Sequence, residues 1–156
     1  MTPEELMRRA IALSMAKMLD GSGGPFGAVI ARDGVIVAEG WNLVTSARDP
    51  TAHAEVVAIR RACQALGRFA LADCEIYTSC EPCPMCLGAI YWARLGGIWF
   101  GNDRGDAAAI GFDDDFLYRE IPRPLAARSI PTRRLLGEEA RAAFAAWRAK
   151  EDRMAY

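Results

Sequence analysis

Residues 79–86 read Ser-Cys-Glu-Pro-Cys-Pro-Met-Cys, and this stretch places two thiols at the start of a helix. Pro84 suits the first helical position, where its fixed φ is favourable and its missing N–H is not needed. Cys83 and Cys86 are three residues apart and therefore share one face of the first turn. Free backbone N–H groups and the positive end of the helix dipole favour thiolate over thiol there. The stretch therefore indicates a metal site, and zinc suits the geometry.

Other chemistries use cysteines at this spacing. A lone Cys-x-x-Cys is also a redox pair, and cysteines spaced by two residues begin an iron–sulfur motif. Ile90 stands where the iron–sulfur run needs its fourth cysteine, which weakens that interpretation. A closed structural zinc site, with Cys80 as a further ligand beside His53, Cys83 and Cys86, stays open and would be catalytically inert.

The only histidine of the chain, His53, stands two residues before Glu55 in Thr-Ala-His-Ala-Glu-Val. His-x-Glu combined with Pro-Cys-x-x-Cys is the pattern of zinc deaminases. Ligation by His53, Cys83 and Cys86 leaves a fourth position for water, whose pKa zinc lowers from about 15.7 toward about 7. Glu55 can then act twice, protonating a ring nitrogen and the departing ammonia. Its alternative role is that of a solvated acid at a helix start, stabilised by the dipole.

Elsewhere the pattern alternates strands with helices and predicts a layered α/β domain. We expect helices over residues 2–18, 53–66, 84–94 and 138–151, a hairpin of strands 26–31 and 35–39, and strands over 74–79 and 97–101. Residues 42–51 are expected to form a loop, and residues 106–118 an acidic irregular segment. A chain of 156 residues is expected to form a single domain.

Composition excludes several classes of protein. Apolar stretches fall far short of the roughly 20 residues that span a bilayer, and the N-terminus lacks the features of a signal peptide, so we expect a cytoplasmic protein without membrane contact. Five cysteines, three of them within residues 80–86, do not suggest a disulfide framework. The net charge is −1, and no basic block marks a nucleic-acid binder, so nucleic acid is not an expected partner.

With these motifs, the sequence resembles the cytidine-deaminase-like superfamily and, within it, the bacterial guanine deaminases. The resemblance extends over Gly-Gly-Pro-Phe-Gly-Ala-Val-Ile from residue 23, Asp-Pro-Thr-Ala-His-Ala-Glu from 49, Tyr-Thr-Ser-Cys-Glu-Pro-Cys-Pro-Met-Cys-Leu-Gly-Ala-Ile-Tyr-Trp-Ala-Arg from 77, and Gly-Phe-Asp-Asp from 111. It implies a three-layer α/β/α domain with a mixed sheet of about five strands. It also implies one Zn²⁺ per subunit and hydrolysis of guanine, a small purine base, to xanthine and ammonia.

The resemblance further implies a set of residues that contact the base. Asn42 offers hydrogen bonds to a purine edge. Asp114 accepts from the ring N1–H and the 2-amino group of guanine, which adenine cannot supply. Phe26 and Trp92 pack on the base plane, Tyr156 closes the pocket, and Ala54 is a further contact.

A homodimer is implied as well, with the segment from about residue 106 to 156 possibly exchanged between subunits. Because tRNA adenosine deaminases share the His53, Cys83 and Cys86 motifs, adenosine in tRNA stays an alternative substrate, as do other free bases and amino-heterocycles. A structural zinc module for protein contacts is the non-enzymatic alternative.

Overall fold

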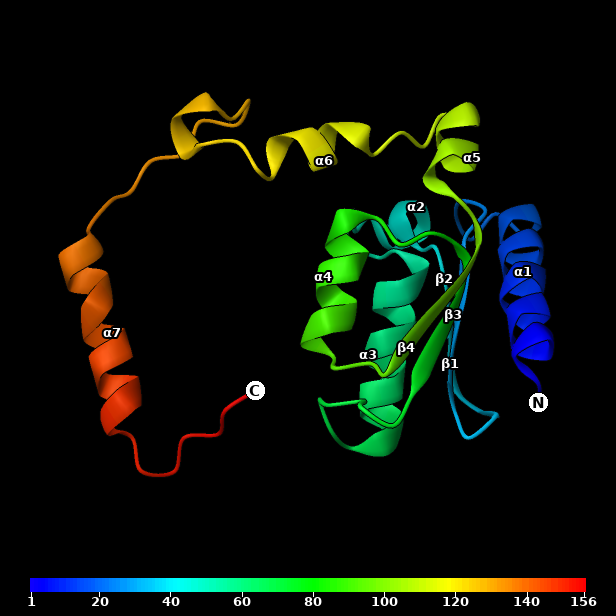
Figure 1. Ribbon diagram of the computed structural model, residues 1–156, viewed down its shortest axis with the longest axis horizontal. Coiled ribbons are helices and arrows are strands. Elements are labelled where there is room, and N and C mark those ends of the chain that lie inside the picture. Colours follow the sequence, from blue (N-terminus) through cyan, green and yellow to red (C-terminus); the bar gives the residue numbers. More distant parts are fainter. The chain divides into compact units, whose positions relative to one another are not determined.

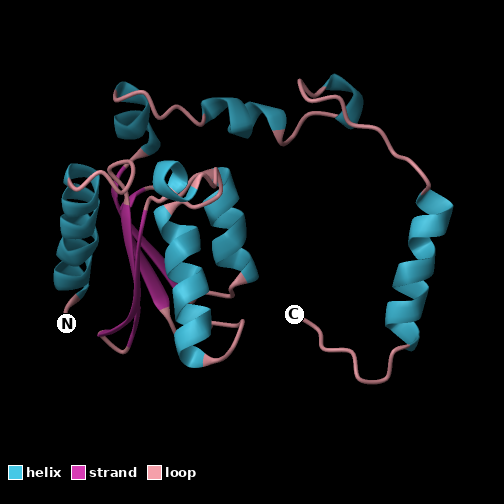
Figure 2. Ribbon diagram, turned by 180° about the vertical axis from the view of Figure 1, so that it is seen from behind, coloured by secondary structure: helices cyan, strands magenta, loops and turns pink.

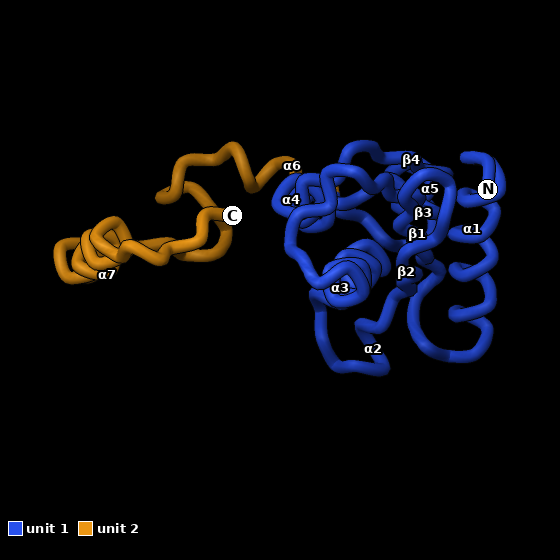
Figure 3. The backbone as a smooth tube through the Cα atoms, turned by 90° about the horizontal axis from the view of Figure 1, so that it is seen from below, with its two compact units in different colours: residues 1–114 blue, residues 115–156 orange.

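A computed structural model describes residues 1–156 and divides them into two compact units, residues 1–114 and 115–156 (Figure 3). The boundary between the units lies after Asp114, whereas the sequence suggested a distinct C-terminal segment from about residue 106. No helix is both long and apolar enough to cross a bilayer.

The first unit is built on a four-stranded sheet in the order β2-β1-β3-β4. Its strands are β1 (Gly27–Arg32), β2 (Val35–Trp41), β3 (Glu75–Cys80) and β4 (Gly97–Asn102). β1 pairs antiparallel with both β2 and β3, whereas β3 and β4 are parallel. The turn between β1 and β2 has positive φ at both Asp33 and Gly34, as tight hairpins require. The mixed sheet and its hairpin are therefore confirmed.

Helices cover both faces of this sheet and make three layers (Figures 1 and 2). On one face lies α1 (Pro3–Leu19), which starts with the expected capping box of Thr2 and Glu5. Its residues Leu6, Ala10 and Leu13 pack with Val29 and Tyr77 of the sheet. The other face carries α3 (Ala54–Leu66) and α4 (Pro84–Trp92), packed on Ala28, Ile30 and Ile76. Successive residues of β1 and β3 thus point to opposite cores, which explains why both strands read as almost continuously buried.

Two segments expected to be irregular contain short helices. Residues 42–51 include a single turn, α2 (Val44–Ala47), that ends at Arg48 in a left-handed conformation. Residues 106–118 overlap α5 (Arg104–Ala109) and α6 (Asp115–Glu120), so the prediction of irregular structure was wrong there. The reason for α5 is a reciprocal cap, in which the side chains of Asp103 and Asp106 each accept from the other's backbone N–H.

The second unit consists of α6, a 3-10 helix η1 (Leu125–Ala127) and α7 (Gly137–Ala149), which confirms the closing helix within two residues at either end. None of its residues is buried. Large apolar side chains are exposed throughout, including Ile130, Leu135 and Phe144 at 77–82%. The unit therefore has no hydrophobic core of its own.

Candidate metal centre and base pocket

His53 and Glu55 are placed by the start of α3. His53 is the N-cap residue and Glu55 lies in the first turn. The helix lies unusually close to β2, because a Cβ added to Gly40 would lie 2.2 Å from the carbonyl oxygen of Ala54. A glycine at this position therefore sets the distance between α3 and the sheet.

Cys83 and Cys86 occupy the equivalent place on α4, with Cys83 as the N-cap residue and Pro84 in the first turn. The Nδ1 atom of His53 lies 3.7 Å from the Cys83 sulfur and 3.5 Å from the Cys86 sulfur. All three ligand atoms lie within 4.8 Å of one another. Tetrahedral zinc, with Zn–S near 2.3 Å and Zn–N near 2.0–2.1 Å, needs nitrogen and sulfur about 3.6 Å apart. The spacing of these donors therefore fits zinc.

Cys80 does not belong to this group. Its thiol lies 3.8 Å from the backbone carbonyl of Asp103, and burial raises its pKa to about 11. A metal-binding thiol has to ionise, and the group that can hold a metal consists of His53, Cys83 and Cys86 alone. The arrangement opposes the closed four-ligand site that the sequence left open.

Glu55 lies beside the ligand group and is only 6% exposed. Its Oε2 atom is 3.4 Å from the Cys86 sulfur, and its Oε1 atom is 3.4 Å from the hydroxyl of Thr78. Burial raises the pKa of Glu55 above its ordinary value. A solvated acid at a helix start would be exposed, so the alternative role for Glu55 does not fit its position.

In the absence of a metal, the surroundings of the two thiols favour the thiolate form of Cys83 only. A hydrogen bond from Cys86, together with one from His53, lowers the pKa of Cys83 to about 4. The same contact between the two sulfurs, with burial, raises the pKa of Cys86. The hydrogen bond to Cys83 raises the pKa of His53. These pKa shifts arise because the three side chains that can ligate a metal are held close together. A bound cation requires the same closeness.

Asn42 is buried, and its side-chain carbonyl is already occupied. Its Oδ1 atom accepts from the backbone N–H groups of Gly24 at 3.3 Å and Val44 at 3.1 Å. Gly23 lies against Asn42 so closely that a Cβ on Gly23 would be 2.1 Å from the backbone carbonyl oxygen of Asn42 and 2.7 Å from Oδ1. Since an amide oxygen has two lone pairs, only the NH₂ group remains for a ligand. Asn42 therefore offers a donor, and not the donor and acceptor together that its residue type allows.

Phe26, a predicted contact of the base, meets a second aromatic ring from a distant part of the first unit. Phe26 and Phe112 contact edge to face, with centroids 4.9 Å apart. Asp114 follows two residues after Phe112. Burial is the main cause that raises the pKa of Asp114, and the negative charge of Cys83 is the second cause. Phe112 was not among the predicted contacts, although Asp114, two residues later, was.

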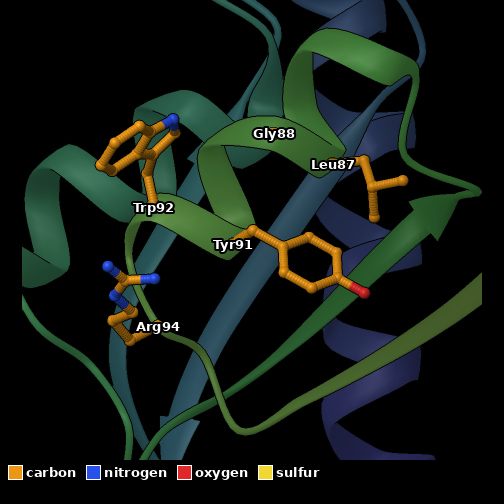
Figure 4. Close-up of a pocket in the computed structure, with 5 residues that line it drawn as sticks. All are labelled: Leu87, Gly88, Tyr91, Trp92 and Arg94. Atoms are coloured by element: carbon orange, nitrogen blue, oxygen red, sulfur yellow. The ribbon is translucent and has the colours of Figure 1, made fainter.

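The structure does not bring Trp92 to this group. Trp92 lies at the last turn of α4, whereas the two cysteines lie at the first turn. It is 64% exposed and lines a separate pocket of about 390 Å³ with Leu87, Gly88, Tyr91 and Arg94 (Figure 4). Ala54 is buried at the first position of α3, and Tyr156 is 74% exposed in the second unit.

Two helix N-termini that share one His/Cys/Cys ligand set, with a buried glutamate beside it, define a zinc deaminase of nucleobases or nucleosides. The chain belongs to the cytidine and deoxycytidylate deaminase zinc-binding family, whose family model matches residues 1–102.

Relatives within this family narrow the resemblance. The chain is 53% identical over 148 residues to the guanine deaminase of Bacillus subtilis, covering 95% of each protein. A crystal structure of guanine deaminase from that organism superposes with a TM-score of 0.98 at 51% identity, covering 100% of this chain and 99% of the other. A tRNA-specific adenosine deaminase of Haemophilus influenzae is 39% identical over 119 residues, 72% of this chain and 68% of that protein.

Proposed function

We propose that the chain is a zinc-dependent guanine deaminase that hydrolyses guanine to xanthine and ammonia. The buried carboxylate of Glu55, 3.4 Å from a sulfur of the ligand group, carries this conclusion, because it places a proton carrier beside a metal site. The 53% identity to a guanine deaminase over nearly the whole chain supports the choice of base.

His53, Cys83 and Cys86 would hold the zinc ion. When bound, zinc makes hydroxide available near neutral pH by lowering the pKa of a coordinated water. The helix dipoles at both N-termini favour the thiolate form that the ligands need. Three protein ligands, and no fourth, match the open coordination of catalytic zinc.

Glu55 moves the protons. The C2–N bond to the amino group of guanine breaks and a C2–O bond forms, so one proton must reach the ring nitrogen and another the departing amine. The Oε2 atom of Glu55 faces the ligand group and can serve both transfers in turn. Burial keeps bulk water away from this carboxylate.

We propose that Asn42 and Asp114 recognise the base. The free NH₂ group of Asn42 requires an acceptor on the ligand, such as a ring nitrogen or carbonyl of a purine. Asp114, as a carboxylate, accepts from the N1–H and 2-amino donors of guanine. Adenine lacks that pair of donors, so Asp114 favours guanine. Phe26, in edge-to-face contact with Phe112, contacts the base plane, and Ala54 supplies buried surface beside Glu55.

We further propose a homodimer in which the C-terminal segment packs on the partner subunit and Tyr156 closes the partner's pocket. The second unit buries no residue of its own, so it needs apolar surface elsewhere. The exposed Tyr91 and Trp92 on the uncharged helix α4 offer such a surface, and Trp92 would then reach a base only across the dimer. Light scattering that found a fully active monomer would contradict this assembly.

The five free cysteines suit a reducing compartment, which supports the proposal of a cytoplasmic enzyme.

The direct test measures ammonia released from guanine, cytosine, adenine, guanosine and tRNA. We expect release from guanine, a loss of about 10² to 10⁴-fold in Glu55→Gln, and bound zinc unchanged in that variant. Cys80→Ser is the control for the metal site and should keep both zinc and activity. Release from tRNA but not guanine would replace guanine by adenosine as the substrate, and full activity of Glu55→Gln would refute the role of this carboxylate.

A further inference from the structure

Four polar or charged residues are buried in the first unit, namely Asn42, Glu55, Thr78 and Ser79. Backbone N–H groups occupy the side-chain oxygens of Asn42 and Ser79, which explains those two residues structurally. Thr78 differs, because its hydroxyl faces a charged side chain. It is 1% exposed and lies on the face of β3 that packs against α3.

The Thr78 hydroxyl has two acceptors in reach and one proton. The carbonyl oxygen of Cys80 is 3.0 Å away, and Oε1 of Glu55 is 3.4 Å away. The other carboxylate oxygen, Oε2, lies beside Cys86 in the ligand group. The hydroxyl therefore distinguishes the two oxygens of Glu55, with one toward the strand and the other toward the reacting centre.

We propose that Thr78 is a positioning residue, whose hydroxyl holds Oε1 of Glu55 so that Oε2 points at the metal ligands and the base. This inference rests on the proposed function and assigns it a residue outside the metal and base contacts. The last torsion of a glutamate side chain is broad, so packing alone does not fix the plane of the carboxylate. A hydrogen bond from a buried, rigid strand does fix it.

The position of Thr78 also explains why a strand residue is suited to this task. Thr78 pairs with Ala28 of β1 and Phe100 of β4, so its backbone is held on both sides. Its second acceptor, the Cys80 carbonyl, lies shortly before Cys83 in the chain. Because the hydroxyl has a single proton, it can donate fully to only one of these acceptors, and the negative charge of the Glu55 carboxylate favours that partner.

Thr78→Val tests the proposal, because valine keeps the shape and removes only the hydroxyl. We expect kcat for guanine to fall about 10- to 100-fold, the effect of one lost hydrogen bond to a charged group. KM and zinc content should stay within about twofold, since Thr78 contacts neither the base nor the zinc ion in this scheme. Thr78→Ser, which keeps the hydroxyl, should recover most of kcat. Thr45→Val, a matched change at an exposed threonine of the first unit, should leave kcat unchanged.

Two further measurements separate positioning from a structural effect. In a Glu55→Gln background, adding Thr78→Val should cost little more, because the hydroxyl acts through the carboxylate. A crystal structure of Thr78→Val should show the Glu55 carboxylate rotated or split between two orientations.

The proposal is overturned by a Thr78→Val variant with the kcat of the wild type, by a Thr78→Ser variant as slow as the valine one, or by an unchanged carboxylate in the crystal. Absence of guanine turnover in the wild-type protein would instead refute the proposed substrate. The orientation of Glu55 in the variant crystal would still decide the role of Thr78.

Discussion

Gly40→Ala should loosen the metal centre without touching any of its ligands. A Cβ at residue 40 would lie 2.2 Å from the Ala54 carbonyl oxygen and 2.6 Å from the Ala58 nitrogen, whereas ordinary contact begins at 3.4 Å. Both atoms belong to the backbone, so no side chain can turn aside. β2 and α3 must therefore separate by about 1 Å.

This displacement is large for a metal site. Ligand distances in a functional site hold within about 0.2 Å, and α3 carries His53 at its start. We expect zinc affinity to fall about 10- to 100-fold, as when the support of a ligand is removed. Overpacking of this kind costs about 1–3 kcal/mol, and about 2 kcal/mol lowers the urea midpoint by about 1 M when m is about 2 kcal/mol/M.

Competition with a chromophoric chelator measures the zinc affinity, and urea unfolding of the metal-free protein measures the stability. Gly88→Ala is the matched control, because no heavy atom lies within 4 Å of a Cβ at this helical position. It should leave zinc affinity unchanged and stabilise α4 by about 0.5–1 kcal/mol. If Gly40→Ala bound zinc as tightly as Gly88→Ala, the close approach of β2 would not position the ligands.

Three further predictions follow from other contacts. Removing zinc with EDTA should lower the melting temperature of the wild type, because a ligand that binds only the folded state stabilises that state. Excess zinc should restore the melting temperature. An unchanged melting temperature after EDTA would argue against metal binding. Arg9 donates to both carboxylate oxygens of Glu39, at 2.6 and 2.8 Å, and this hydrogen bonding lowers the pKa of Glu39 below its ordinary value of 4.5. The stabilisation by this ion pair is thus present above pH 4.5 and is lost as the pH falls through the pKa of Glu39 in the folded protein. The urea midpoint of Arg9→Met should therefore fall less than that of the wild type when the pH is lowered through this range. An equal fall in both proteins would contradict the role of the Arg9–Glu39 pair. Thr2→Ala removes the cap of α1 and should cost about 0.5–2 kcal/mol in urea unfolding, with Thr45→Ala, at an exposed threonine, near zero for comparison.

Local signals were sufficient where the chemistry lies within one turn of chain. Pro84 favours a helix start through its own fixed φ, and the capping box of α1 depends only on Thr2 and Glu5. The irregular segment around residue 106 was predicted wrongly for a similar reason. Residues 106–118 suggested an acidic irregular segment, but Asp106 and the preceding Asp103 each cap the other's backbone.

Thr78 is a functional candidate that the sequence could have indicated. It occupies an inward position of β3, on the same face as Ile76, where an apolar residue is normally expected. A polar residue at such a position needs a partner, and only the fold shows that the partner is Glu55.

The amino-acid sequence by itself determined the donor atoms, because the types and spacing of His53, Glu55, Cys83 and Cys86 are local. It also determined the alternation of helices and strands. The tertiary structure alone decided that Cys80 stays outside the ligand group, that Asn42 has only a donor left, and that the first turns of α3 and α4 converge. These outcomes depend mainly on contacts between residues far apart in the chain, such as His53 and Cys83, which are 30 positions apart. Their geometry is set by how closely the layers pack.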